Sequence, residues 1–348
     1  MNIESLIRPN ILALKPYSSA RHEFTGHGEV FLDANENPFE NEVNRYPDPL
    51  QSELKKRIGH IKEIPTDHIF LGNGSDEAID LIFRIFCRPG VDEIIVLPPT
   101  YGMYQVSADI HEVKVRKVPL NEFYQPDVPA ILDQRSQQTK ILFLCSPNNP
   151  TGNLVDKATI IELIESFQGI VVIDEAYVDF SPARTNIPLL DKYDNLIILQ
   201  TLSKAWGMAA IRLGMAFSSP KIISYFNKVK APYNISSLTQ HFALDRLSKE
   251  AEMKHEVEII LQEKQRLISA LSLLPEVINV YPSDTNFLLV TVHHPDAVYQ
   301  ALIGKGIVVR SRAKEPGCEG SLRITIGTPR ENTILLEVLN AFKYNITP

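Results

Sequence analysis

Residues 196–214 read LIILQTLSKAWGMAAIRLG and join an apolar strand to a loop that carries a lysine and an arginine. The apolar run at 196–199 is typical of a buried strand in a parallel sheet. The loop that follows presents a hydroxyl at Ser203, an amine at Lys204 and a guanidinium at Arg212. An isolated lysine is normally a solvated surface charge, so a functional interpretation depends on what the other segments bring to this loop.

A second buried strand is predicted at 170–173, where Ile-Val-Val-Ile precedes Asp174. Ligands of open α/β sheets bind at the carboxyl ends of the strands, so Asp174 and the nearby Tyr177 are expected at a binding edge. An apolar strand followed by Asp-Glu is also typical of nucleotide hydrolases, but these require a G-x-x-x-x-G-K-[ST] loop. The Gly-Lys pair at 304–305 lacks the preceding glycine, which excludes that class of hydrolase.

Two more predicted strands end in segments with polar or aromatic side chains. The strand at 140–145 runs into a turn rich in Asn, Pro and Gly, which places Asn149 at the same sheet edge as Asp174. The strand at 93–97 precedes Tyr101, whose ring is able to stack on a flat ligand. On local evidence alone, the first segment is better explained as an ordinary turn than as a ligand site. The second is explained equally well by a tyrosine packed under a loop.

A glycine-rich turn at 72–74 leads into a segment with apolar residues at helical spacing. Ser75 is the expected N-cap, so the turn and the helix amino end together predict a site for an anion. The segment is not a dinucleotide fingerprint, because the third glycine is missing and Asp76 would repel a pyrophosphate. By itself this motif is weak evidence for an anion site, and it supports one only together with the other segments.

Together these groups are the ones that a pyridoxal phosphate site requires. The Lys204 amine would bond covalently to the cofactor aldehyde, while Ser203 and Arg212 would bind the phosphate. Asp174 would pair with a protonated pyridine nitrogen and keep the ring electron-withdrawing. The turn at 72–74 would complete the phosphate site.

The order of these motifs resembles that of the fold-type I aminotransferases, which depend on pyridoxal phosphate. More narrowly, the chain is similar to the histidinol-phosphate aminotransferases. This similarity covers close to the full length, and its supporting segments are residues 8–10, 15–21, 33–38, 44–48, 232–234 and 321–328.

The resemblance implies a role for each matching residue. Lys204 would hold the cofactor and later move a proton, and Asp174 would pair with the pyridinium nitrogen. Arg323 would bind the carboxylate or phosphate of the substrate, with Arg310 as a second cation and Tyr17 near the substrate. The other implied contacts are Tyr101 on the ring face, Tyr177 and Asn149 at the ring oxygen (Asn149 also near the substrate), and Ser75, Asp76 (through its backbone), Ser203 and Arg212 at the phosphate.

The resemblance also implies partners and a reaction. The family tyrosine that matches Tyr46 reaches the cofactor phosphate of the neighbouring subunit, which implies a homodimer with shared active sites. The implied substrates are an amine phosphate and a 2-oxo acid: L-histidinol phosphate and 2-oxoglutarate would give imidazole-acetol phosphate and glutamate, in histidine biosynthesis.

Other functions stay open. A pyridoxal phosphate-dependent decarboxylase of a phosphorylated amino acid and an aromatic amino-acid aminotransferase both remain alternatives on this sequence. A transcription regulator built on the same fold would need an added helix-turn-helix, and the sequence offers no basic segment for one.

Strands alternate with helical segments from about residue 30 to about residue 245, which predicts an α/β fold with a mostly parallel sheet covered by helices on both faces. The resemblance implies seven strands in that sheet. A charged helix at about 249–274 would lead into a smaller α/β domain with strands at 286–292, 306–310 and 322–326. We therefore expect a large cofactor-binding domain at 30–245. The second domain would comprise 1–29 and 246–348, with the first thirty residues folded back onto it and onto the mouth of the site.

Composition adds limits. The 348 residues carry 35 Lys and Arg against 42 Asp and Glu, a net charge of −7, so nothing suggests a nucleic-acid surface. Three cysteines without paired metal spacing favour reduced thiols and no metal site. Neither a signal peptide nor a membrane span is expected, which favours a cytoplasmic enzyme.

Overall fold

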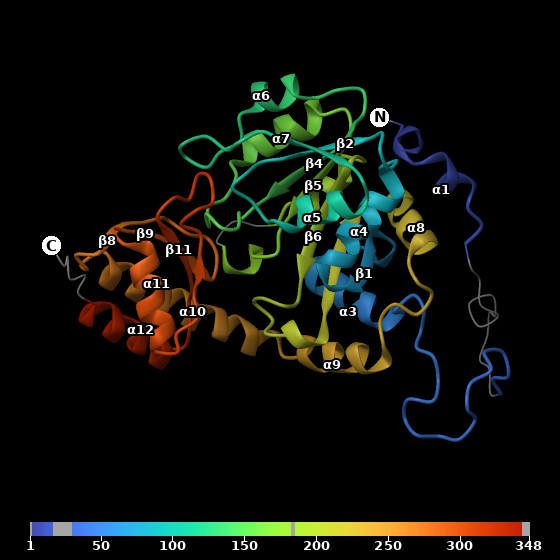
Figure 1. Cartoon of the computed structure of the whole chain (residues 1–348). Helices are drawn as coiled ribbons and strands as arrows, with labels where there is room; N and C mark the ends of the chain where they lie inside the picture. The colour runs from blue at the N-terminus through green and yellow to red at the C-terminus, as the bar shows by residue number, and fades with distance from the viewer. Residues whose placement is uncertain (1, 17–29, 182–184, 343–348) are drawn as a thin grey trace.

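The larger sheet of the molecule has seven strands, mostly parallel. The computed structural model describes residues 2–16, 30–181 and 185–342, and its larger sheet has the order β1-β7-β6-β5-β4-β2-β3 (Figure 1). β7 runs antiparallel to both neighbours, whereas the other four pairs are parallel, so the expected sheet is confirmed. The strands are β1 (Ile69–Asn73), β2 (Glu93–Val96), β3 (Lys114–Lys117), β4 (Thr139–Cys145), β5 (Ile170–Asp174), β6 (Leu196–Thr201) and β7 (Leu213–Ser218).

Helices cover both faces of this sheet. Along β5, Val171 and Ile173 point into one hydrophobic cluster, while Ile170 and Val172 point into the other. Successive side chains of a strand alternate between faces, so an unbroken apolar strand requires a cover on both sides. One face is covered by α4 (Gly74–Phe86), α5 (Met103–Ile110) and α8 (Pro220–Val229), and the other by α3 (Ser52–Lys62), α6 (Val128–Asp133), α7 (Lys157–Ser166) and α9 (Ser237–Leu247).

A smaller antiparallel sheet, orange to red in Figure 1, lies at the carboxyl-terminal end of the chain. Its order is β10-β11-β9-β8, and its cluster of buried residues joins the sheet to three helices. The domain limits at 30–245 and 246–348 stay a prediction. The elements are α10 (Glu250–Leu271), β8 (Val277–Val280), β9 (Phe287–Val292), α11 (Pro295–Gly304), β10 (Arg310–Ser311), β11 (Ser321–Thr325) and α12 (Pro329–Ala341).

The strand expected at 306–310 is wrong over most of its length, because β10 begins only at Arg310. Gly306 has a φ of +76°, which turns the chain sharply after α11. Val308 is then 83% exposed, so this segment does not join the ladder beside β11 until Arg310 pairs with Arg323.

The amino-terminal segment lies on the larger part of the molecule. Ile3, Ile7 and Ile11 are buried in the cluster formed by α4 and α8, and the Arg8 amide donates to Ile85 O at 3.0 Å. The expectation that this segment packs on the smaller domain is therefore wrong for residues 3–12, and Figure 1 shows α1 (Pro9–Ala13) on the side of the molecule where α8 lies. Ile3, Ile7 and Ile11 all pack into this cluster, although the chain is extended at Ile7 between two short helices.

Short 3₁₀ turns complete the chain, and no described helix is both long and apolar enough to cross a bilayer. The three cysteines are free and buried. The remaining elements are η1 (Ile3–Leu6), α1 (Pro9–Ala13), η2 (Thr66–His68), η3 (Val178–Phe180), η4 (Ile187–Asp191) and η5 (Ala209–Ile211).

Candidate active site

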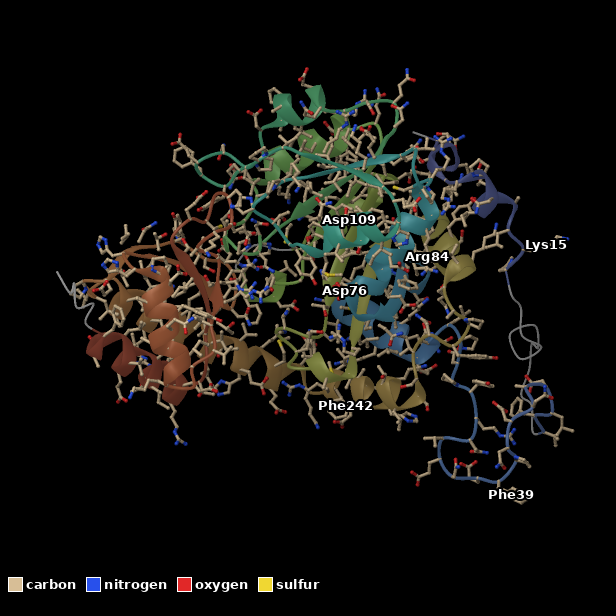
Figure 2. All side chains as sticks on the ribbon, in the orientation of Figure 1. Lys15, Phe39, Asp76, Arg84, Asp109 and Phe242 are labelled. Carbon is tan, nitrogen blue, oxygen red and sulfur yellow. The ribbon has the colours of Figure 1, made fainter. Side chains whose placement is uncertain are left out.

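The carboxyl ends of β4, β5 and β6 and the amino end of α4 surround a cavity of about 100 Å³. Figure 2 labels Asp76, which lies in the first turn of α4 in the larger part of the molecule; its side chain is partly exposed. Parallel strands end at one edge, which is why residues far apart in the sequence meet here. Nine residues predicted for the site line the cavity: Ser75, Asp76, Tyr101, Asn149, Asp174, Tyr177, Ser203, Lys204 and Arg212.

One end of the cavity is built to bind an anion. The first backbone amides of α4 have no partner within their helix, and the helix dipole adds positive potential. Arg212 comes close to this turn: a Cβ on Gly74 would lie 2.6 Å from Arg212 Nη2, and Gly74 has a φ of +73°. On Gly214, a Cβ would lie 2.1 Å from the Ser75 nitrogen. Glycines at both positions therefore let the guanidinium and the helix amino end approach each other.

Asp174 ends β5 as a fully buried carboxylate. It accepts a hydrogen bond from Tyr104 Oη at 2.8 Å and another from the Ala176 amide at 3.1 Å. Burial nevertheless raises the pKa of this carboxyl to about 6, because two neutral donors do not replace its hydration. A cation held in the cavity would restore the ionised form, as a protonated pyridine nitrogen does.

Lys204 lies in the loop after β6 and lines the same cavity. Burial, followed by the positive charge of Arg323, lowers the pKa of its amine, so the neutral form is more populated than in a surface lysine. Its Nζ lies 5.6 Å from the centre of the Tyr177 ring. The loop is fixed by Thr201, whose Oγ1 accepts from the Ser203 amide at 3.1 Å.

Asn149 links the cavity to the smaller sheet. Arg323, on β11, donates from Nη1 to Asn149 Oδ1 at 2.5 Å, and its guanidinium lies 5.4 Å from the centre of the Phe287 ring. Arg310 lies opposite Arg323 in the β10–β11 pair and is exposed. Arg323 thus contacts a cavity residue from the smaller sheet and Arg310 lies beside it, although neither lines the cavity itself.

A third described residue, Tyr46, also lies away from this cavity. Tyr46 is 51% exposed and stacks on Tyr233, with the ring centres 4.5 Å apart, in a separate surface pocket. Its predicted contact is with the cofactor phosphate of a neighbouring subunit, and this contact stays a prediction. Tyr17 lies outside the described residues.

Sequence reasoning missed Tyr104, Cys145 and Thr201. Cys145 and Thr201 line the cavity, and Tyr104 donates a hydrogen bond to Asp174. A signal for Tyr104 existed: Tyr104 and Ala108 have the spacing that marks the buried face of α5. Tyr101 was predicted to stack on a ligand; its Oη also donates to Asp76 Oδ1 at 3.1 Å.

Comparisons with known proteins agree with this geometry. Residues 30–339 match the family model for aminotransferase class I and II. The histidinol-phosphate aminotransferase of Parabacteroides distasonis is 54% identical, over 98% of this chain and 99% of the relative. Among solved structures, the histidinol-phosphate aminotransferase of Clostridium acetobutylicum has a TM-score of 0.78 at 25% identity, covering 86% of this chain and 90% of that one.

A further solved structure bears on the fold. The histidinol-phosphate aminotransferase of Sinorhizobium meliloti, in complex with pyridoxal-5'-phosphate, has a TM-score of 0.78 at 22% identity, with 85% of this chain and 82% of that chain covered. With matches of this extent in both sequence and fold, the chain belongs to the class I and II aminotransferases and, within them, to the histidinol-phosphate aminotransferases.

Proposed function

We propose that the protein transfers the amino group of L-histidinol phosphate to 2-oxoglutarate, with pyridoxal phosphate as cofactor, in cytoplasmic histidine biosynthesis. The observation that carries this proposal is the 54% identity to a histidinol-phosphate aminotransferase over nearly the whole of both chains. The cavity supports it, because an amine, a buried carboxylate and an anion site line one space.

The residues present fit each part of the cofactor. The Lys204 amine suits its aldehyde, and Asp174 suits a protonated ring nitrogen. For the phosphate, the amino end of α4, with Ser75 and the backbone of Asp76, forms one wall, while Ser203 and Arg212 form the other. The remaining proposed contacts are Tyr101 on the ring face and Tyr177 and Asn149 at the ring oxygen.

The chemistry divides between the cofactor and the protein. When bound, pyridoxal phosphate supplies an electron-withdrawing ring that accepts the electron pair left when the substrate Cα loses its proton. Lys204 removes that proton as a neutral amine and delivers it again, which its lowered pKa allows. Asp174 holds the ring nitrogen protonated, and burial makes its charge effective by excluding water.

The substrate anion is assigned to the smaller sheet. Arg323 is already oriented by Asn149 and Phe287, so little side-chain freedom is lost when it binds a ligand. A guanidinium donates two parallel hydrogen bonds to either a carboxylate or a phosphate, which suits both substrates. Arg310 is the proposed second cation.

The main test uses the wild-type protein reconstituted with pyridoxal phosphate. L-histidinol phosphate and 2-oxoglutarate should yield glutamate in step with loss of the amine, and phenylalanine should be a much poorer amino donor. Release of carbon dioxide from a phosphorylated amino acid, with no need for 2-oxoglutarate, would instead establish the decarboxylase. A preference for phenylalanine would establish the aromatic aminotransferase.

A homodimer with shared sites forms part of the proposal. The segment at 30–46 extends away from the rest of the chain, and Figure 2 labels Phe39 at its far end. It carries exposed apolar side chains, among them Leu32 at 88% and Phe39 at 80%. Apolar surface of this kind marks an interaction site, and a second copy of the chain would place Tyr46 at the cofactor phosphate of its partner.

Tyr46→Phe is expected to weaken cofactor binding about tenfold, the typical value of one hydrogen bond to a charged group. Mixing it with Lys204→Ala should restore tight binding, because a mixed dimer combines Lys204 of one chain with Tyr46 of the other. The dissociation constant for pyridoxal phosphate is the measurement, with Tyr299→Phe as a control in α11. Failure of the mixture to restore affinity would contradict shared sites.

A further inference from the structure

Three arginines share one face of the smaller sheet. Arg310 and Arg323 lie directly opposite each other in the β10–β11 pair, so their side chains point the same way. The Arg312 amide donates to Ser321 O at 2.9 Å, which extends the ladder beyond β10. Arg312 is two residues after Arg310 and therefore points to that same face, where Asn149 meets Arg323.

Arg312 has an ion-pair partner, but one of its hydrogen-bond donors has no acceptor among the described residues. Its side chain is 21% exposed, and its Nη1 lies 2.7 Å from Glu315 Oε2. Its Nε is buried and has no hydrogen-bond partner among the described residues. A buried donor without an acceptor lowers stability, and an anionic ligand beside it would supply that acceptor.

The charge of Arg312 reaches the wall of the cavity. Burial raises the pKa of the Tyr177 phenol, and the positive charges of Arg323 and Arg312 both oppose that rise. Glu315 offsets one of the three arginine charges, so this row keeps an excess positive charge. That excess suits a phosphate dianion better than a single carboxylate.

The two substrates differ in where they carry their anion. In an amino acid the carboxyl carbon is bonded directly to the amine-bearing carbon. In an amine phosphate, a methylene and an ester oxygen separate the phosphorus from that carbon. The phosphate anion therefore lies further from the reacting carbon than a carboxylate does.

We propose that Arg312 binds the phosphate of the amine-phosphate substrate beside Arg323, and so determines the preference of the enzyme for that substrate over an amino acid. The proposal rests on the proposed function. In this arrangement Glu315 orients the Arg312 guanidinium and also lowers the affinity of that guanidinium for anions.

The test compares both amino donors in the holoenzyme. Arg312→Gln should raise KM for L-histidinol phosphate by about tenfold or more, the effect of losing a charge-assisted hydrogen bond. KM for glutamate in the reverse direction and the dissociation constant of pyridoxal phosphate should change by less than about twofold. Arg312→Lys keeps the charge without the bidentate geometry, so its KM for L-histidinol phosphate should lie between those of the wild type and Arg312→Gln.

Glu315→Gln is the matched control, because it removes the same ion pair. If the pair only braces the loop, both substitutions raise both KM values alike, which would overturn the proposal. If Arg312 binds phosphate, Glu315→Gln leaves KM for L-histidinol phosphate unchanged or lower. A wild-type protein that does not use L-histidinol phosphate contradicts the proposed function; a wild type that does, with unaltered KM in Arg312→Gln and Arg312→Lys, contradicts only this inference.

Discussion

Lys204→Ala is expected to abolish transamination, with kcat falling by at least about 10⁴-fold, because one amine supplies both the covalent attachment and the proton transfer. Burial and the charge of Arg323 lower the pKa of Lys204, and this increases its neutral fraction at neutral pH. A neutral amine has a free electron pair for an aldehyde carbon and for a proton. Alanine provides neither function.

The measurement pairs activity with covalent attachment. After borohydride reduction, mass spectrometry should find pyridoxal phosphate on Lys204 of the wild type and no modification in Lys204→Ala. Lys204→Arg, which keeps the charge but is not a usable nucleophile, should be as inactive. Lys192→Ala is the control, since Lys192 is an exposed lysine paired with Glu165. Near-normal turnover in Lys204→Ala would refute the role of this residue.

Asp174→Asn is expected to lower kcat by about 10²- to 10³-fold, as the loss of one preorganised electrostatic group typically does. An amide has the size of the carboxylate but no charge, so it does not keep a ring nitrogen protonated. The anion site, with Ser75 and Arg212, remains intact, so the cofactor should still bind. Stopped-flow absorbance of each half-reaction would measure the loss.

The neighbouring Glu175→Gln provides a matched control. Glu175 is also fully buried, but its carboxylate accepts hydrogen bonds from Thr185, Asn186 and Gln200 and does not line the cavity. This substitution should lower stability and leave the kcat of the folded holoenzyme nearly unchanged. Equal losses of kcat in the two variants would mean that Asp174 acts only through the fold.

The same Asp174→Asn change should stabilise the cofactor-free protein. The pKa of Asp174 rises from 3.8 to about 6 on folding. Because the folded pKa is the higher one, its contribution to stability is present below pH 3.8 and is lost as the pH rises through about 6. Above that pH the wild type should be less stable than Asp174→Asn by about 3 kcal/mol, and the gap should narrow as the pH falls.

Urea unfolding of both cofactor-free proteins at about pH 5 and about pH 8 would measure this gap. A gap of the same size at both values would mean that Asp174 does not titrate in the way its burial requires. Opposite effects on rate and on stability identify a group that is kept for catalysis at a cost to the fold.

Much of the site could be predicted from local patterns. The apolar run of β5 predicted a strand buried on both faces, and the position of Asp174 at its end predicted a carboxylate at the binding edge. The same reasoning brought Asn149 and Lys204 to that edge. It worked because the direction of parallel strands, which local sequence encodes, decides where their ends meet.

Contacts between distant segments could not be predicted in this way. The bond from Tyr104 to Asp174 depends on how α5 is rotated against the sheet, and the contact of Arg323 with Asn149 depends on how the two sheets meet. Likewise, the position of Ile7 on α4 was decided by which apolar surface remained uncovered.

By itself, the sequence determined the α/β class, the mostly parallel sheet and the residues that gather at its edge, because hydrophobic periodicity and turn chemistry act over a few residues. The tertiary structure alone decided which side chains hold Asp174, where the amino-terminal segment packs and that Arg312 joins Arg323 on one face. These depend on complementary surfaces of segments far apart in the chain, and no local pattern records how such surfaces fit.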